Sequence, residues 1–246
     1  MLWCIPLLML QALPLNAQPV TLSLNTYAGP PLSTPAQTGY YDQILLEAFR
    51  RLGVAVTIGH LPAERSLQNA DRGIDDGDFV RIAGLEQQYP NLLMVPEKID
   101  DLEFVAFTRH LRLKTTSWNT LQPYHVGIVR GWKILEENLA GVRQLTAVKD
   151  QEQLFNLLKH NRMDVVVYAR KEGYSLLWNQ GVTDGVALEP PLVVKSMHLY
   201  LNRKHAAMVP PLAAILRQMK SDGTYAAIAR QTLTRFIPTE APGARP

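Results

Sequence analysis

Hydrophobic positions along the chain recur with two spacings, about every second residue and about every 3.6 residues, which are the periods of strands and helices. From residue 20 to residue 82 they predict a strand, a helix, a strand, a helix and a strand, over 20–24, 41–52, 54–58, 63–72 and 79–82. Gly53 and Gly73 follow the two helices, and glycine readily adopts the left-handed conformation that ends a helix. This order is typical of a lobe in which helices cover a sheet of parallel strands.

A second series of the same kind follows a crossing segment at 104–108. It predicts alternating strands and helices over 125–129, 132–140, 145–148, 154–158, 164–168 and 173–179. A return strand and two closing helices complete the pattern, over 193–201, 211–220 and 225–234. We therefore expect an α/β fold with two parallel α/β lobes joined by two hinge crossings. The carboxyl ends of the strands would then meet at a cleft between the lobes.

The first 17 residues form an uncharged, apolar stretch that ends in a small residue before Gln18. This pattern predicts a secretory signal peptide, since the stretch is too short to span a bilayer about 30 Å thick. Cys4 is the only cysteine of the chain, so cleavage would leave a protein without a thiol. We expect periplasmic localisation and no stable membrane insertion after the signal peptide is removed.

Composition and charge are those of an ordinary globular protein and do not indicate a nucleic-acid-binding protein. The chain has 246 residues, of which 47% are hydrophobic and 19% are charged, and its formal net charge is +3. The densest basic group, RHLRLK at 109–114, lacks the interleaved aromatic residues that stack on nucleic-acid bases. We interpret this group as a solvated connector and expect no nucleic-acid partner.

Catalytic and metal-binding motifs are absent from the sequence. It contains no G-x-S-x-G, S-x-x-K or H-E-x-x-H pattern, and its six histidines have no paired metal-ligand spacing. Three aspartates in GIDDGDFVR lack the glycine and glutamate positions of a calcium loop. We therefore expect neither an enzyme nor a cofactor or metal. The alternative is an acid–base pair assembled from residues that are distant in the sequence.

Five segments carry a family resemblance. They read GYYDQILLEAFRRLG, PAERSLQNADRGIDDGDFVR, VGIVRGWKILEENL, NRMDVVVYAR and LNRKHAAMVPPLAAILRQMKSDGTYAAIARQ. In order and spacing they resemble the periplasmic solute-binding proteins of the polar-amino-acid type (family 3), which serve bacterial ABC importers. The resemblance implies a type II periplasmic-binding-protein fold whose two lobes close over a small ligand. It implies one lobe at 18–108 and 190–237 and a second at 109–189. The Pro-, Gly- and Ala-rich composition from Pro238 onward predicts a flexible tail at 238–246.

Two departures from that family concern the ligand. In its amino-acid binders an arginine clamps the ligand's carboxylate, and Gln87 stands where that arginine would fall. The second-lobe strand of those binders tends to end in an aspartate that takes the amino group, whereas this strand ends in Tyr168, Ala169 and Arg170. The resemblance therefore does not imply an amino acid as the ligand.

Positively charged residues at the expected cleft edge suggest an anionic or polar ligand. Arg81 ends the strand of GDFVR and Arg65 begins a helix at the same edge. Arg130, Gly131 and Trp132 lie between a strand and a helix, where free backbone N–H groups favour an anion. The alternative for Arg81 is an ion pair with Asp75, Asp76 or Asp78, for Arg65 a pair with Glu64 or Asp71, and for Gly131 simple turn geometry.

Aromatic residues supply the remaining candidates for the ligand site. Tyr27 follows the first strand and Tyr40 precedes the first helix, where rings either stack on a ligand or form the wall of the cleft. Tyr168 and Arg170 occupy the place of the family's amino-group acceptor. We expect a monomeric binding protein that delivers its small-molecule ligand to an ABC permease. Two alternatives stay open: a ligand-sensing partner of a membrane sensor protein, and a dehydratase-like enzyme on the same fold.

Overall fold

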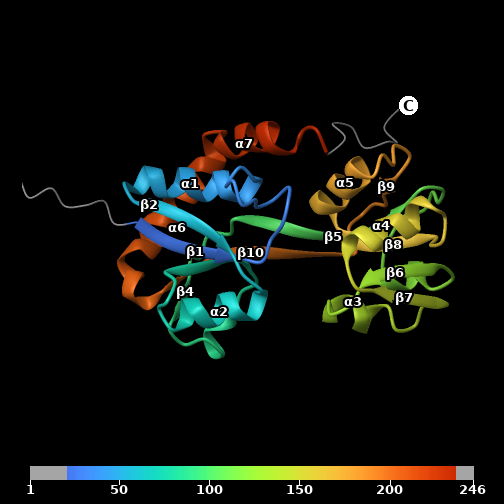
Figure 1. The fold of residues 1–246 in the computed structure, drawn as a ribbon, viewed down its shortest axis with the longest axis horizontal. Helices are drawn as coiled ribbons and strands as arrows, with labels where there is room; N and C mark the ends of the chain where they lie inside the picture. The colour runs from blue at the N-terminus through green and yellow to red at the C-terminus, as the bar shows by residue number, and fades with distance from the viewer. Residues whose placement is uncertain (1–20, 237–246) are drawn as a thin grey trace, which may run out of the picture.

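The computed structural model describes residues 21–236, which form two lobes connected by two long strands (Figure 1). The predicted signal peptide at 1–17 and the predicted tail at 238–246 lie outside the described residues. The expected α/β architecture of two lobes joined by two crossings is confirmed. The domain boundaries taken from the sequence stay a prediction.

Lobe 1 is built from both ends of the described chain. Its first part contains β1 (Thr21–Thr26), α1 (Tyr40–Leu52), β2 (Ala55–His60), α2 (Ala63–Asp71), β3 (Gly77–Arg81), η1 (Leu85–Gln87) and β4 (Leu92–Met94). Its second part contains η3 (Arg203–Met208), α6 (Val209–Ser221) and α7 (Thr224–Leu233). Strands β2, β1 and β3 are adjacent and parallel, as the alternating pattern predicts.

Lobe 2 repeats this alternation of strands and helices. It contains η2 (Trp118–Leu121), β6 (His125–Val129), α3 (Lys133–Asn138), β7 (Gln144–Val148), α4 (Gln151–Lys159), β8 (Val165–Ala169), α5 (Arg170–Asn179) and β9 (Val186–Ala187). Strands β7, β6 and β8 are adjacent and parallel. Asp150 accepts a hydrogen bond of 2.8 Å from the backbone N–H of Gln153 and thereby caps α4.

Two antiparallel strands, β5 (Asp100–Thr108) and β10 (Val193–Asn202), connect the lobes. The chain leaves lobe 1 along β5 and returns along β10, so the two strands run in opposite directions. Each also joins a lobe's sheet in antiparallel orientation, β10 beside β3 and β5 beside β8. Each lobe therefore has a mixed sheet, whereas the sequence predicted parallel lobes; the parallel strands are the three that precede each crossing.

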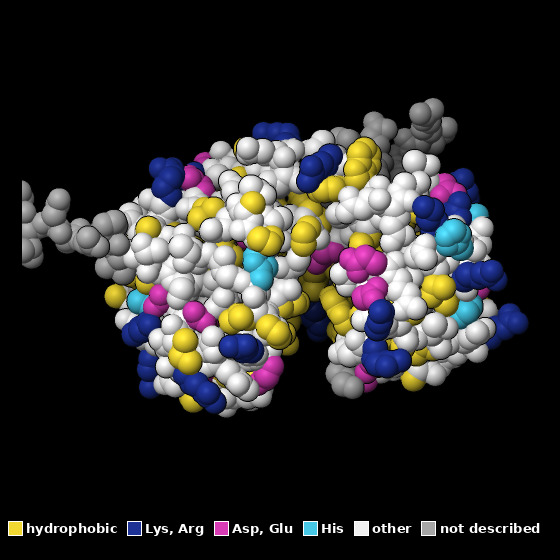
Figure 2. Space-filling model, in the orientation of Figure 1, with side chains coloured by type: hydrophobic (Ala, Val, Ile, Leu, Met, Phe, Trp, Pro, Cys, Tyr) yellow, Lys and Arg dark blue, Asp and Glu magenta, His cyan; other side chains and the backbone are white. Residues whose placement is uncertain are grey.

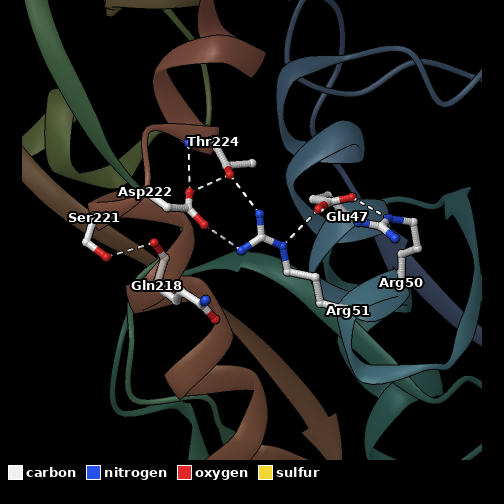
Figure 3. A network of polar contacts seen from close by, with 7 residues as sticks. All are labelled: Glu47, Arg50, Arg51, Gln218, Ser221, Asp222 and Thr224. Carbon is white, nitrogen blue, oxygen red and sulfur yellow. Dashed lines mark hydrogen bonds and ion pairs between the residues drawn. The ribbon is translucent and has the colours of Figure 1, made fainter.

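The sequence motif KSDGTY at 220–225 forms the junction between the closing helices and α1 (Figure 3). Arg51 of α1 donates to Asp222 at 2.7 Å and to Thr224 at 2.8 Å. Its Nε also donates to Glu47 at 2.8 Å, and Arg50 donates to the same carboxylate. Hydrogen bonds from Arg50 and Arg51 lower the pKa of Glu47 to about 2. This junction ties α1 to the turn between α6 and α7 within lobe 1.

Candidate functional site

A cavity of about 410 Å³ lies between the two lobes. The loop at Tyr27–Pro30 and Val80 line it from lobe 1, Leu102 lines it from a connecting strand, and side chains of α4, α5, β8 and Trp132 line it from lobe 2. Figure 2 shows the notch that separates the lobes, with hydrophobic and acidic side chains gathered where the lobes meet. The volume of the cavity falls within the range of roughly 300 to 1,000 Å³ that is typical of small-molecule sites.

Aromatic rings form much of the lobe 2 wall. The ring of Trp132 packs against Tyr168 with centroids 5.5 Å apart, and it meets Phe104 edge to face at 5.0 Å. Tyr168 in turn meets Phe155 at 5.8 Å in a T-shaped arrangement. These contacts hold Trp132 and Tyr168 in fixed orientations along the cavity. Both were predicted as ligand contacts, and the structure brings them together with Tyr27 on one cavity.

One face of α5 forms the rest of this wall. Glu172, Ser175, Leu176 and Asn179 follow the i, i+3, i+4, i+7 spacing of a helical stripe, and all four line the cavity. The Oε2 atom of Glu172 is buried and has no hydrogen-bond partner. Burial raises the pKa of Glu172 to about 7, and nearby Asp100 adds to this rise while Lys171 opposes it.

The lobe 1 wall contains a strained residue. Val80 has a φ of 66°, which is a conformation that β-branched residues rarely adopt. The pairing of β3 with β10 is irregular at this point, because Phe79 pairs with Leu199 and Arg81 pairs with His198. Val80 is thus the extra residue of a β-bulge, a feature that is over-represented next to functional sites.

This bulge places the Arg81 side chain beside Asp78. In a regular strand Asp78 and Arg81 would point to opposite faces, but the inserted residue brings them to one face. Arg81 donates to Asp78 through Nε at 3.0 Å and through Nη2 at 2.8 Å, and Nη2 also donates to the Ala63 carbonyl at 2.9 Å. Both side chains are buried. Its guanidinium lies 4.7 Å from the ring centroid of Tyr27, so Arg81 supports a cavity residue from behind and does not line the cavity.

Arg170 is also committed to carboxylates of its own chain. It forms ion pairs with Glu103 of β5 and with Glu189, the latter through two hydrogen bonds of 2.6 and 3.0 Å. The next residue, Lys171, binds Asp100 of β5, and Asp100 also accepts a hydrogen bond of 3.1 Å from Tyr41 of lobe 1. The start of α5 is therefore tied to the connecting strand and, through Asp100, to α1.

The other predicted contacts lie away from the cavity. Arg65 and Arg130 are exposed, and Arg130 makes a long contact of 3.5 Å to the Ala147 carbonyl. The Gly131 N–H already donates to Glu136 at 2.8 Å, so it is not free for an anion. Tyr40 is buried and packs against Tyr41 at 5.5 Å. None of these four lines the cavity among the described residues, and their ligand roles stay predictions.

Sequence reasoning missed the acidic side chains of this site. Glu152 in the first turn of α4 and Glu172 in the first turn of α5 line the cavity, and no lysine or arginine is among its described lining residues. The sequence predicted the second of these helices to start at Gly173, three residues after its actual start at Arg170. A helix read from Arg170 onward would have placed Glu172, Ser175 and Asn179 on one face.

Two features are absent from the residues that the structure describes. No helix between residues 21 and 236 has the length and apolar character needed to cross a membrane. Over the same residues, no group of three or more histidine, cysteine, aspartate or glutamate side chains has the arrangement of a metal site.

Comparison with known proteins gives the fold. No protein-family model matches the chain. An uncharacterized protein of Shewanella oneidensis is 25% identical over 203 residues, which cover 79% of this chain and 76% of that protein. An ancestral cationic amino acid solute-binding protein superposes with a TM-score of 0.70 at 17% identity, over 87% of this chain and 96% of that one.

A sensor protein shares the same fold. A histidine kinase sensor domain with similarity to periplasmic binding proteins superposes with a TM-score of 0.67 at 16% identity, over 88% of this chain and 96% of that domain. The resemblance to family 3 solute-binding proteins that the sequence indicated is thus confirmed at the level of the fold. Proteins of this fold include binding proteins and sensor domains.

Proposed function

We propose that the protein binds a small polar solute in the interlobe cavity and that its lobes close on the solute. The observation that carries this proposal is that residues of both lobes line one cavity and that two strands connect the lobes. A ligand that touches both walls stabilises the closed arrangement, because it gains contacts there that an open arrangement lacks.

The interlobe tie at Asp100 supports a hinge movement. Tyr41 of lobe 1 and Lys171 of lobe 2 both bind this carboxylate on the connecting strand. Opening the lobes would pull these two partners apart, so the tie contributes to the balance between open and closed states. We place the flexing region in the paired stretch of β5 and β10 that joins the lobes, Asp100–Phe104 and Val193–Met197.

The proposal is tested by thermal-shift screening of the protein against amino acids, amines, carboxylates, phosphorylated compounds and oligopeptides. A solute at a hundred times its dissociation constant should add roughly 2.7 kcal/mol to the free energy of unfolding. Small-angle scattering with that solute should show a smaller radius of gyration than without it. A screen without a stabilising solute, or a bound solute that leaves the radius unchanged, would contradict lobe closure.

Delivery to an ABC permease is the role we propose first, for a monomer exported to the periplasm by its signal peptide. Docking on a membrane sensor is the second candidate, and the fold shared with a histidine kinase sensor domain favours it. Co-purification from cells separates the two, since the bound membrane protein would be either a permease or a sensor. We propose no catalysis; conversion of the bound solute into a product would instead indicate the dehydratase-like alternative.

A further inference from the structure

Most carboxylates near the cavity form ion pairs within the described part of the chain, but the Glu172 carboxylate does not. The carboxylates of Asp78, Asp100 and Glu103 each have a cationic partner within the chain. Glu172 belongs to the same region, but its Oε2 atom is buried without a hydrogen-bond partner. An unpartnered buried carboxylate is costly when it is ionised, so its presence in a cavity calls for an explanation.

The neighbouring cation does not supply the missing partner. Lys171 is next to Glu172 in the sequence, but its Nζ binds the Asp100 carboxylate and lies 3.3 Å from the Asp101 carbonyl. Arg170 is held by Glu103 and Glu189. Lys171 therefore acts on the Glu172 carboxylate only through its charge, which Asp100 opposes, and Glu152 adds a second acid to the lining of the same cavity.

The aromatic rings beside Glu172 favour the same kind of ligand. Trp132 and Tyr168 line the cavity together with Glu172, and the negative faces of such rings attract cations, whereas the Tyr27 ring already meets the Arg81 guanidinium. Burial raises the pKa of Tyr27 and Tyr168, so both hydroxyls stay protonated and uncharged near neutral pH. The buried Tyr41 on the hinge side behaves in the same way. The cavity thus combines carboxylates with neutral rings.

From this arrangement we infer that the ligand carries a cationic group, an ammonium or a guanidinium, which binds beside the Glu172 carboxylate and the rings of Trp132 and Tyr168. This inference rests on the proposed function and names its ligand class. It replaces the anionic ligand that the arginines in the sequence suggested, because Arg81 and Arg170 are neutralised within the chain and Arg65 and Arg130 lie off the cavity.

The test sorts the stabilising solutes by charge and compares a matched pair, methylguanidinium and N-methylurea, which have similar shapes and differ in being cationic or neutral. We expect the cationic solutes to bind and methylguanidinium to bind more tightly than N-methylurea. In the Glu172→Gln variant the affinity for the cationic solute should fall about thirtyfold or more, since truncating a buried charge partner costs about 2 to 5 kcal/mol. The control is Glu137→Gln, at an exposed position on α3 that does not line the cavity.

The pH dependence gives a second measurement. A cation that binds the ionised Glu172 should gain affinity by up to tenfold per pH unit as the pH rises toward about 7, and level off above it. Glu172→Gln should abolish this dependence while the variant stays folded.

The outcomes separate the two proposals. Binding of neutral or anionic solutes with unchanged affinity in Glu172→Gln would overturn the cationic ligand and leave the binding function intact. A screen with no stabilising solute of any charge would overturn both.

Discussion

The two walls of the cavity treat charge in opposite ways. On the lobe 1 side, Arg81 and Asp78 neutralise each other in a buried bidentate pair behind Tyr27. On the lobe 2 side, Glu172 and Glu152 face the cavity, and one oxygen of Glu172 has no partner. In our proposal lobe 1 provides a rigid support, whereas lobe 2 provides the charge that the ligand neutralises.

The largest effect on stability should come from breaking the buried ion pair between Arg81 and Asp78 in lobe 1. Arg81→Met leaves the buried Asp78 carboxylate without its cation, and losing one partner of a buried pair costs roughly 3 to 5 kcal/mol. We expect a fall of that size in the free energy of unfolding, measured by urea denaturation.

A double variant provides the control for this experiment. Asp78→Leu together with Arg81→Met removes both charges and fills a similar volume, so most of the lost stability should return. If the single variant were as stable as the parent, the pair would contribute no structural support to Tyr27. Arg81 would then again be a candidate for ligand contact.

The position of α5 can be disturbed without changing any charge. A Cβ on Gly173 would lie 2.2 Å from Cε2 and 2.3 Å from Cζ of Phe107. We expect Gly173→Ala to cost roughly 1 to 3 kcal/mol, because the buried Phe107 ring has to move in a packed core. It should also weaken ligand binding, since the helix carries Glu172.

Gly141→Ala is the matched control in the same lobe. The nearest atom to its added Cβ would be a flexible glutamine side-chain atom at 3.8 Å, which is an ordinary contact. Its melting temperature should stay close to that of the parent. Equal losses in the two variants would mean that the backbone of lobe 2, and not the contact with Phe107, limits its stability.

The unpartnered Glu172 carboxylate of lobe 2 should make the free energy of unfolding depend on pH. The folded protein holds the Glu172 proton up to about pH 7, whereas an unfolded glutamate releases it near its ordinary pKa of 4.5. The folded state therefore binds more protons between these values, and its stability falls as the pH rises through this window.

Glu172→Gln removes this dependence. At pH 8 we expect the ligand-free variant to be more stable than the parent by about 1 to 2 kcal/mol, after allowance for partial exposure. At pH 4 the two should be alike. Calorimetric melting at both pH values measures this, with Glu137→Gln as the control that should change neither. A variant less stable than the parent at pH 8 would mean that the carboxylate has a partner after all.

The sequence predicted the fold well because the fold depends on periodic burial. The apolar faces of α1 and α4 and the alternation in β1 and β2 appear directly in the residue order. The antiparallel crossing strands were less accessible, since a buried strand reads the same in either direction. The start of α5 was misplaced, because Arg170–Glu172 precede the helical glycine that we took as its beginning.

The site was predicted less well, for two physical reasons. A strand's alternation places Asp78 and Arg81 on opposite faces, and only the bulge at Val80 brings them together. Valine gives no sign of such a bulge, because a residue with positive φ is usually glycine. Residue order also does not reveal which charges neutralise each other across long separations, such as Arg170 with Glu103 and Lys171 with Asp100.

The smallest effect should come from the exposed arginines, and it sharpens the comparison of the two walls. Arg130 lies on the lobe 2 surface with a long contact to a carbonyl, and Arg65 is exposed on α2. We expect Arg130→Ala and Arg65→Ala to change the free energy of unfolding by less than about 0.5 kcal/mol, as is usual for surface substitutions. Calorimetric titration should give a dissociation constant within threefold of the parent's, because neither side chain lines the cavity. A tenfold loss in Arg130→Ala would instead mean that lobe closure brings this arginine to the ligand. Lobe 2 would then present both a carboxylate and a guanidinium to the ligand, and the ligand would carry an anionic group beside its cationic one.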